Sequence, residues 1–215
     1  MENTKNTLIE GNIIKAIALF AIPLFFSNLF QQLYNTIDMA IISYYLGDIA
    51  LATIGSTTAI FDLMVGFGQG IGTGFSIVSA RYFGANKLED IKKSVASGII
   101  LILISACCMT ILFYFGMPYI LKALNTPSQI IKEALSYIQI IALFITITLL
   151  YNYSAGLLRA IGDSKTPLYI LCVASILNVI LDIICITKFS LGVKGAAIAT
   201  VIAQFFASVL CIIFI

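Results

Sequence analysis

The sequence predicts an all-α membrane protein, a bundle of six transmembrane helices, from its composition and its apolar pattern. Hydrophobic residues make up 60% of the 215 residues, charged residues only 10%, and the mean hydropathy is +1.06. A soluble domain carries about 25% charged residues, so too little charge remains here to cover a water-facing surface. Lipid is therefore expected to contact most of the outside, and apolar runs recur along the whole chain.

Six apolar segments are long enough to cross a membrane, which takes about 20 residues. Glycine, proline, asparagine and aspartate separate them, and these are the residues that turns favour. The expected spans are residues 13–46, 49–82, 94–121, 130–158, 167–187 and 193–215.

Composition also excludes several classes of function. The chain has no His and a net charge of +2, which removes the commonest metal ligand and general base and gives no reason to expect nucleic acid. Ser-His pairs and HExxH sequences are absent, so we expect neither an enzyme nor a bound cofactor.

The distribution of basic residues predicts the orientation. Lys and Arg gather in cytoplasmic loops, and eight of the 12 basic residues fall on the side of the N-terminus and of the second and fourth connections if the spans alternate. We therefore expect the N-terminus to be cytoplasmic, with the chain crossing the plasma membrane several times.

One polar stripe runs along the first span. Asn28, Gln31, Asn35 and Asp38 are spaced by three, four and three residues, so they share one face of a helix. Lipid cannot satisfy these groups. They either form hydrogen bonds that hold helices together or line a polar cavity, and the carboxylate of Asp38 favours the cavity.

A second carboxylate lies at a similar depth. Asn178 and Asp182 share a face of the fifth span, and Asp38 and Asp182 both fall in the outer half of the membrane. Two buried carboxylates would repel if both were ionised, so the pair favours a shared proton or a bound cation. Thr200 on the sixth span can add a neutral oxygen, and such ligands suit Na⁺.

Three features of the first two spans have alternative interpretations. Asp62 either lines a cavity or is satisfied by local pairing. Gly66, Gly70 and Gly74 form a GxxxGxxxG face, which we interpret as close helix packing rather than a nucleotide loop. Pro23 interrupts the hydrogen bonds of the first span and predicts a bend.

Several stretches resemble the multidrug and toxic compound extrusion (MATE) transporters. They are Ile22-Pro23 through Gln31-Gln32-Leu33-Tyr34 to Asp38, Gly70 to Ala85, Leu158-Arg159-Ala160-Ile161-Gly162-Asp163-Ser164-Lys165-Thr166-Pro167, and Asn178 to Asp182. Such transporters have two lobes of six helices, twelve in all, related by an axis along the membrane normal. The resemblance implies that residues 1–215 are the N-terminal lobe. The sequence stops within an apolar run, so we expect a C-terminal lobe as a missing partner.

The resemblance also implies a function, a cation-coupled antiporter that exports drugs and toxic organic compounds across the membrane, with membrane lipid as a further partner. Asp38, Asn178, Asp182 and Thr200 match a Na⁺ or H⁺ site, Tyr137 matches a tyrosine beside it, and Pro23 matches the proline at a helix bend. The charged residues expected to be buried within the spans are three Asp, with no buried Arg or Lys, which favours cationic or neutral substrates. A flippase for lipid-linked precursors and a non-transporting truncated membrane protein are the alternatives.

Overall fold

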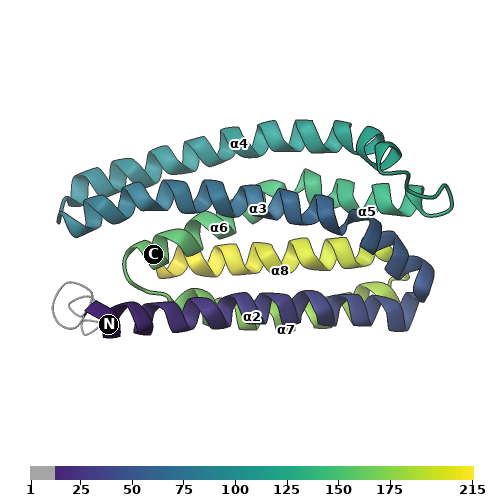
Figure 1. Cartoon of the computed structure of the whole chain (residues 1–215), viewed down its shortest axis with the longest axis horizontal. Coiled ribbons are helices and arrows are strands. Elements are labelled where there is room, and N and C mark those ends of the chain that lie inside the picture. Colours follow the sequence, from purple (N-terminus) through teal and green to yellow (C-terminus); the bar gives the residue numbers. More distant parts are fainter. Residues whose placement is uncertain (1–12) are drawn as a thin grey trace.

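A computed structural model describes residues 13–215, and Figure 1 shows this part of the chain as a layered bundle of helices. Within the described residues no strand occurs. The helices are α2 (Ile13–Leu46), α3 (Asp48–Gly84), α4 (Leu88–Ala123), α5 (Ile131–Leu143), α6 (Ile145–Ala160), α7 (Lys165–Thr187) and α8 (Val193–Phe214).

The predicted six spans are confirmed, with two differences in their bounds. Five of the described helices are long and apolar enough to cross a membrane, and α5 with α6 makes a sixth, bent span. Helix α4 begins at Leu88 rather than at residue 94, because a helix can continue into water once its charged first turns are solvated. Its first turn contains Glu89 and Asp90, which suit the positive end of the helix dipole.

The fourth predicted span is two helices instead of one. Helices α5 and α6 meet at Phe144 and are bent by 49°. No proline or glycine lies at the break, so no local sequence pattern predicts it. A hydroxyl from a neighbouring helix bonds to the backbone beside the break. Thr110 Oγ1 on α4 donates to the carbonyl of Ala142 at 3.2 Å. That bond satisfies a carbonyl beside the break.

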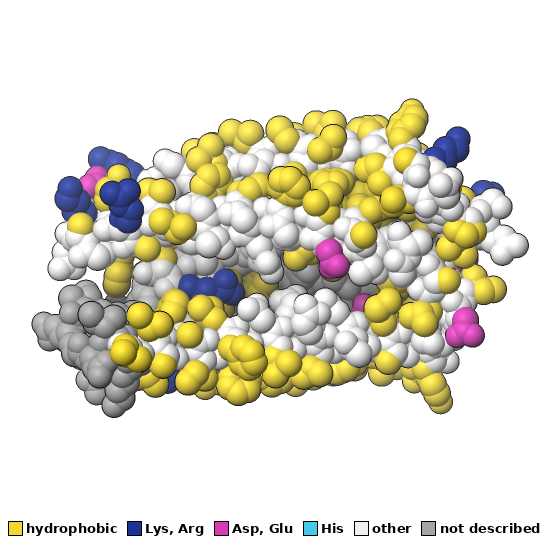
Figure 2. Space-filling view, in the orientation of Figure 1, with side chains coloured by type: hydrophobic (Ala, Val, Ile, Leu, Met, Phe, Trp, Pro, Cys, Tyr) yellow, Lys and Arg dark blue, Asp and Glu magenta, His cyan; other side chains and the backbone are white. Residues whose placement is uncertain are grey.

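The order of packing leaves one side of the bundle open. Helix α2 packs mainly on α7, α3 packs mainly on α6, and α8 lies between them against α6 and α7. Both described ends of the chain lie at the same end of the bundle (Figure 1). Figure 2 shows a hollow between α3 and α2, while large apolar side chains cover much of the surface around it.

Glycines allow α3 to approach α6 closely, but they are not the glycines that the sequence pattern favoured. A Cβ at Gly72 would lie 2.9 Å from the backbone nitrogen of Tyr153, so only glycine fits there. Added Cβ atoms at Gly66, Gly70 and Gly74 would meet nothing within 4 Å. The close-packed face within the described chain is therefore that of Gly68 and Gly72, and the predicted GxxxGxxxG face is open.

Helix α2 is continuous through Pro23, which lies inside Ile13–Leu46. Ser27 lies one helical turn after Pro23, and its hydroxyl donates to the carbonyl of Pro23 at 2.8 Å. Proline leaves the carbonyl four residues earlier without its helical donor, so this turn has one backbone hydrogen bond fewer than an ordinary helical turn. The bend at Pro23 stays a prediction.

Asp163 organises the start of α7. Its Oδ1 accepts from the backbone N–H groups of Lys165 and Thr166 at 3.1 and 3.0 Å, and its Oδ2 accepts from the Thr166 hydroxyl at 2.6 Å. These bonds satisfy N–H groups that the first helical turn leaves free.

Replacing Asp163 with Ala is expected to lower the free energy of unfolding by about 1 kcal/mol, the usual effect of losing a cap. Asp163→Asn keeps one acceptor and should lose less. Thermal unfolding of the purified chain in detergent measures both, and equal stability of the Ala variant and the wild type would contradict the capping role.

Candidate functional site: a buried carboxylate pair

The central feature is a pair of carboxylates between α2 and α7. Asp38 on α2 is 9% exposed and Asp182 on α7 is fully buried. The two side chains lie within hydrogen-bonding reach of each other. Two carboxylates can share a hydrogen bond only through a proton, and otherwise their repulsion must be offset by a cation.

Neighbouring side chains fix the orientation of Asp182. With the Asn178 amide turned so that both of its polar atoms have partners, its nitrogen donates to Asp182 Oδ2 at 2.9 Å. Its oxygen then accepts from the backbone N–H of Thr200 at 3.2 Å. Asn178 is fully buried and Thr200 nearly so, so α7 and α8 hold this carboxylate in one position.

One oxygen of each carboxylate remains free. Among the described residues, Asp38 Oδ1 and Asp182 Oδ1 are buried without a hydrogen-bond partner. An unpaired buried acceptor costs about 1–3 kcal/mol, and more when charged. The geometry therefore presents two oxygen ligands that a proton or a hard cation would satisfy.

A cavity of about 60 Å³ adjoins the pair. It is large enough for a few water molecules or an ion, and it is far below the roughly 300 Å³ of a typical organic-ligand pocket. Polar lining comes from Asn35, Asp38, Tyr137, Thr200 and, in addition to the residues predicted from the sequence, Tyr34, Thr57 and Thr58.

Tyr34 is the site residue that the sequence interpretation missed. Its hydroxyl lies within hydrogen-bonding reach of Thr200, and it lines the cavity with Asp38. The signal was available, because Tyr34 precedes Asp38 by four residues and so shares its helix face. Tyr137 lies on α5, is 5% exposed and lines the same cavity.

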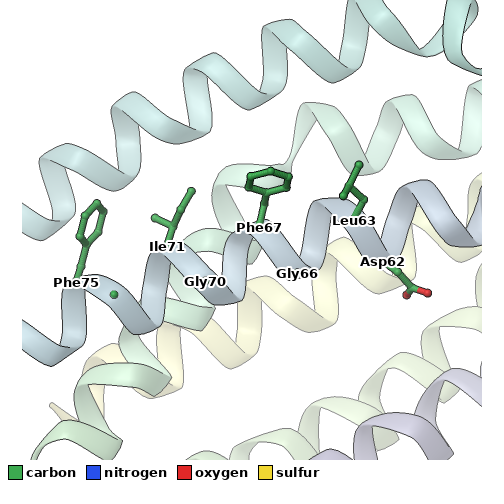
Figure 3. A pocket seen from close by; sticks show the side chains of 8 residues that line it. Asp62, Leu63, Gly66, Phe67, Gly70, Ile71 and Phe75 are labelled. Atoms are coloured by element: carbon green, nitrogen blue, oxygen red, sulfur yellow. The ribbon is translucent and has the colours of Figure 1, made fainter.

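Asp62 lies at the edge of the cavity and at the edge of a larger groove of about 790 Å³ on α3. Its carboxylate is exposed, and the local pairing considered as an alternative does not occur among the described residues. Figure 3 shows Asp62 pointing from α3 away from Leu63 and Phe67, toward the side of the bundle that holds α2. Asp62 is thus placed at the opening, outside the buried pair.

The polar stripe of α2 divides between two sites. Asn35 and Asp38 face the small cavity, whereas Asn28 and Gln31 line a separate polar pocket of about 180 Å³. Arg159 from the last turn of α6 lines that pocket too, and its Nε is buried. Arg159 follows directly after the fourth expected span, and its place in the lining of this pocket is a feature that the sequence interpretation did not predict.

Comparison with known proteins decides the family. The MatE family model matches residues 23–184, a range that contains the whole acidic site except Thr200. The chain belongs to the MATE family.

Relatives and solved structures of MATE transporters agree with this assignment. The probable multidrug resistance protein YoeA of Bacillus subtilis is 29% identical over 94% of this chain and 46% of that relative. The crystal structure of MATE in the bent conformation has a TM-score of 0.88 at 27% identity, over 98% of this chain and 46% of that one.

A MOP superfamily transporter from Pyrococcus furiosus, described as having reverse polarity of its binding pocket, also has a TM-score of 0.88 at 27% identity, again over 98% and 46%. The chain thus spans less than half the length of the relatives it matches. This multi-span membrane protein has the fold of one MATE lobe, and its family is one of transporters, not enzymes.

Proposed function

We propose that this MATE lobe couples export of toxic organic compounds to entry of Na⁺ or H⁺, with Asp38 and Asp182 as the coupling site. The observation that carries the proposal is the buried carboxylate pair with one free oxygen on each side chain. Thr200 can add a further oxygen ligand, Asn178 holds Asp182 in position, and Tyr137 and Tyr34 line the cavity. No enzymatic step is part of the proposal.

The size of the cavity supports an ion as its occupant and places the organic substrate elsewhere. The acidic cavity measures about 60 Å³ and the groove beside Asp62 about 790 Å³. Substrate binding in the larger hollow, next to the smaller cation site, brings both ligands to the same helices without overlap. Asp62 at the edge of both favours substrates that carry a positive charge.

Coupling follows if the cation binds one conformation better than the other, as any linked equilibrium requires. A bound cation relieves repulsion within the carboxylate pair and strengthens the contact of α2 with α7. Without it, α2 is held less firmly, and the turn at Pro23 is where this helix bends. The membrane potential contributes about 2.3 kcal/mol per charge per 100 mV, which drives the cation inward.

The proposed transporter has a defined orientation in the membrane and a second lobe as its partner. Both described ends of the chain lie at one end of the bundle (Figure 1), and we infer from the excess of Lys and Arg that this end faces the cytoplasm in the plasma membrane. The face of Gly66, Gly70 and Gly74 belongs to the groove beside Asp62 and has no packing partner among the described residues. A second lobe that faces this groove would enclose a substrate bound there, and the relatives extend well beyond the part that this chain matches.

Proteoliposomes that contain this lobe joined to a second lobe test the proposal. Na⁺ and pH gradients are imposed separately, and efflux of a cationic probe such as tetraphenylphosphonium is followed. Efflux that depends on one gradient names the coupling ion. Efflux that depends on neither gradient would contradict cation coupling. The lobe would then belong to a facilitator or a flippase.

A further inference from the structure

The separate polar pocket lined by Asn28, Gln31 and Arg159, which we call the basic pocket, differs in chemistry from the acidic site. It measures about 180 Å³ and is lined by residues of α2, α3, α6 and α7. Arg159 is its only charged lining residue among the described residues, and four residues with side-chain amides line the same pocket, namely Asn28, Gln31, Gln69 and Asn152. The pocket is therefore a cationic site with neutral hydrogen-bonding walls.

Arg159 is half-buried and lacks a partner for the buried part of its guanidinium. Its Nε is buried without a hydrogen bond, and across residues 13–215 the side chain forms no ion pair. The acidic residue nearest in sequence, Asp163, is committed to capping α7. An unpaired buried donor on a charged group costs more than a neutral one, so the pocket is arranged for an acceptor that the described chain does not provide.

The ligand chemistry follows from this geometry. A guanidinium presents its N–H groups in a planar fork that matches two oxygens of one oxyanion. One guanidinium without a second cation balances a single negative charge, which fits a carboxylate better than a phosphate dianion. The volume is below the roughly 300 Å³ of a whole-ligand site, so the pocket holds one end of a larger molecule.

Along α2, ten residues separate Asn28 in the basic pocket from Asp38 in the acidic cavity, about 15 Å at 1.5 Å per residue. Figure 2 shows basic atoms in the hollow toward the end that holds both described termini, and acidic atoms farther along it. An extended organic molecule with charges of both signs would span this distance.

We propose that the basic pocket binds the carboxylate of an organic substrate through Arg159, so that amphoteric compounds lie along the hollow with their anionic end inward. Its role in transport rests on the proposed export function, whereas binding itself does not. Asn28 and Asn152 donate further hydrogen bonds to the carboxylate from either side of the pocket.

Calorimetric titration of the purified chain in neutral detergent tests the proposal with a matched pair of probes, 1-naphthoate and 1-naphthamide. They share ring and shape and differ in charge. Wild type is expected to bind naphthoate roughly tenfold more tightly, the ratio typical of a hydrogen bond to a charged group. Arg159→Gln should abolish the preference, Arg159→Lys should keep part of it, and Lys165→Gln, at an exposed position, should leave it unchanged.

Equal affinity of wild type for both probes, or a preference that survives Arg159→Gln, would overturn the proposal. Dihexanoyl phosphatidate is the third probe, and tighter binding than naphthoate would assign the pocket to a lipid head group instead. If Arg159→Gln does not fold by circular dichroism, Asn28→Leu on the exposed face of α2 is expected to reduce naphthoate affinity severalfold and naphthamide affinity little; an unchanged ratio would overturn the proposal.

Failure of the basic pocket and failure of the proposed export function are distinguishable. Tetraphenylphosphonium carries no oxyanion, so its gradient-driven efflux does not need Arg159. Wild type that exports tetraphenylphosphonium but shows no preference for naphthoate would refute the basic pocket alone.

Discussion

Asp38→Asn is expected to abolish gradient-driven efflux from proteoliposomes that contain this lobe joined to a second lobe. The amide cannot carry the negative charge that attracts a cation, and Asp182 then lacks a partner with which to share a proton. Binding of a cationic probe at the Asp62 edge should persist, because Asp62 lies outside the buried pair. The measurement is efflux under each imposed gradient, with probe binding measured on the same preparation.

Asp48→Asn is the matched control, because Asp48 lies exposed in the first turn of α3 and makes the same change of charge. Asp182→Asn should resemble Asp38→Asn, since either carboxylate alone leaves half of the site. Gradient-driven efflux by Asp38→Asn at the wild-type rate would show that the pair only holds α2 and α7 together.

Gly72→Ala is expected to lower stability more than any other Gly→Ala substitution at the contact between α3 and α6. The new Cβ would lie 2.9 Å from the backbone nitrogen and 3.0 Å from the preceding carbonyl carbon of α6, and backbone cannot move aside as a flexible side chain can. Overpacking of this kind costs about 1–3 kcal/mol. Unfolding of the purified chain in mixed micelles by increasing SDS measures the change.

Gly70→Ala provides the control on the same helix. Nothing lies within 4 Å of a Cβ at Gly70, and Ala is favoured over Gly in a helix by about 1 kcal/mol. Gly70→Ala should therefore unfold at the same or a higher SDS fraction than wild type. Equal losses for Gly70→Ala and Gly72→Ala would contradict the assigned packing face.

The spans were predictable because lipid imposes one dominant requirement, a long apolar helix with its backbone hydrogen bonds satisfied. The placement of Asp38 and Asp182 was predictable for the same reason. Carboxylates within spans must turn inward, and equal depth then brings them together. Asn178 and Thr200 followed from their helical spacing and from resemblance to the family.

Features that depend on neighbouring helices were not predictable. Both faces of α3 carry glycines at small-residue spacing, and only packing on α6 selects Gly72. The break at Phe144 carries no proline or glycine, and a hydroxyl from α4 supports it. Arg159 lies at a helix end, where a long basic side chain can extend to the membrane surface. The sequence does not show that its side chain lines a pocket between the helices instead.

The most direct test of the carboxylate pair is an infrared difference spectrum of the purified chain, recorded between low and high pH and between K⁺ and Na⁺. A shared proton predicts a protonated carboxyl band that disappears on raising the pH or adding Na⁺, and that is lost in Asp38→Asn and Asp182→Asn. A spectrum without such a band, or a band that persists in both variants, would contradict the assignment of the pair as the coupling site.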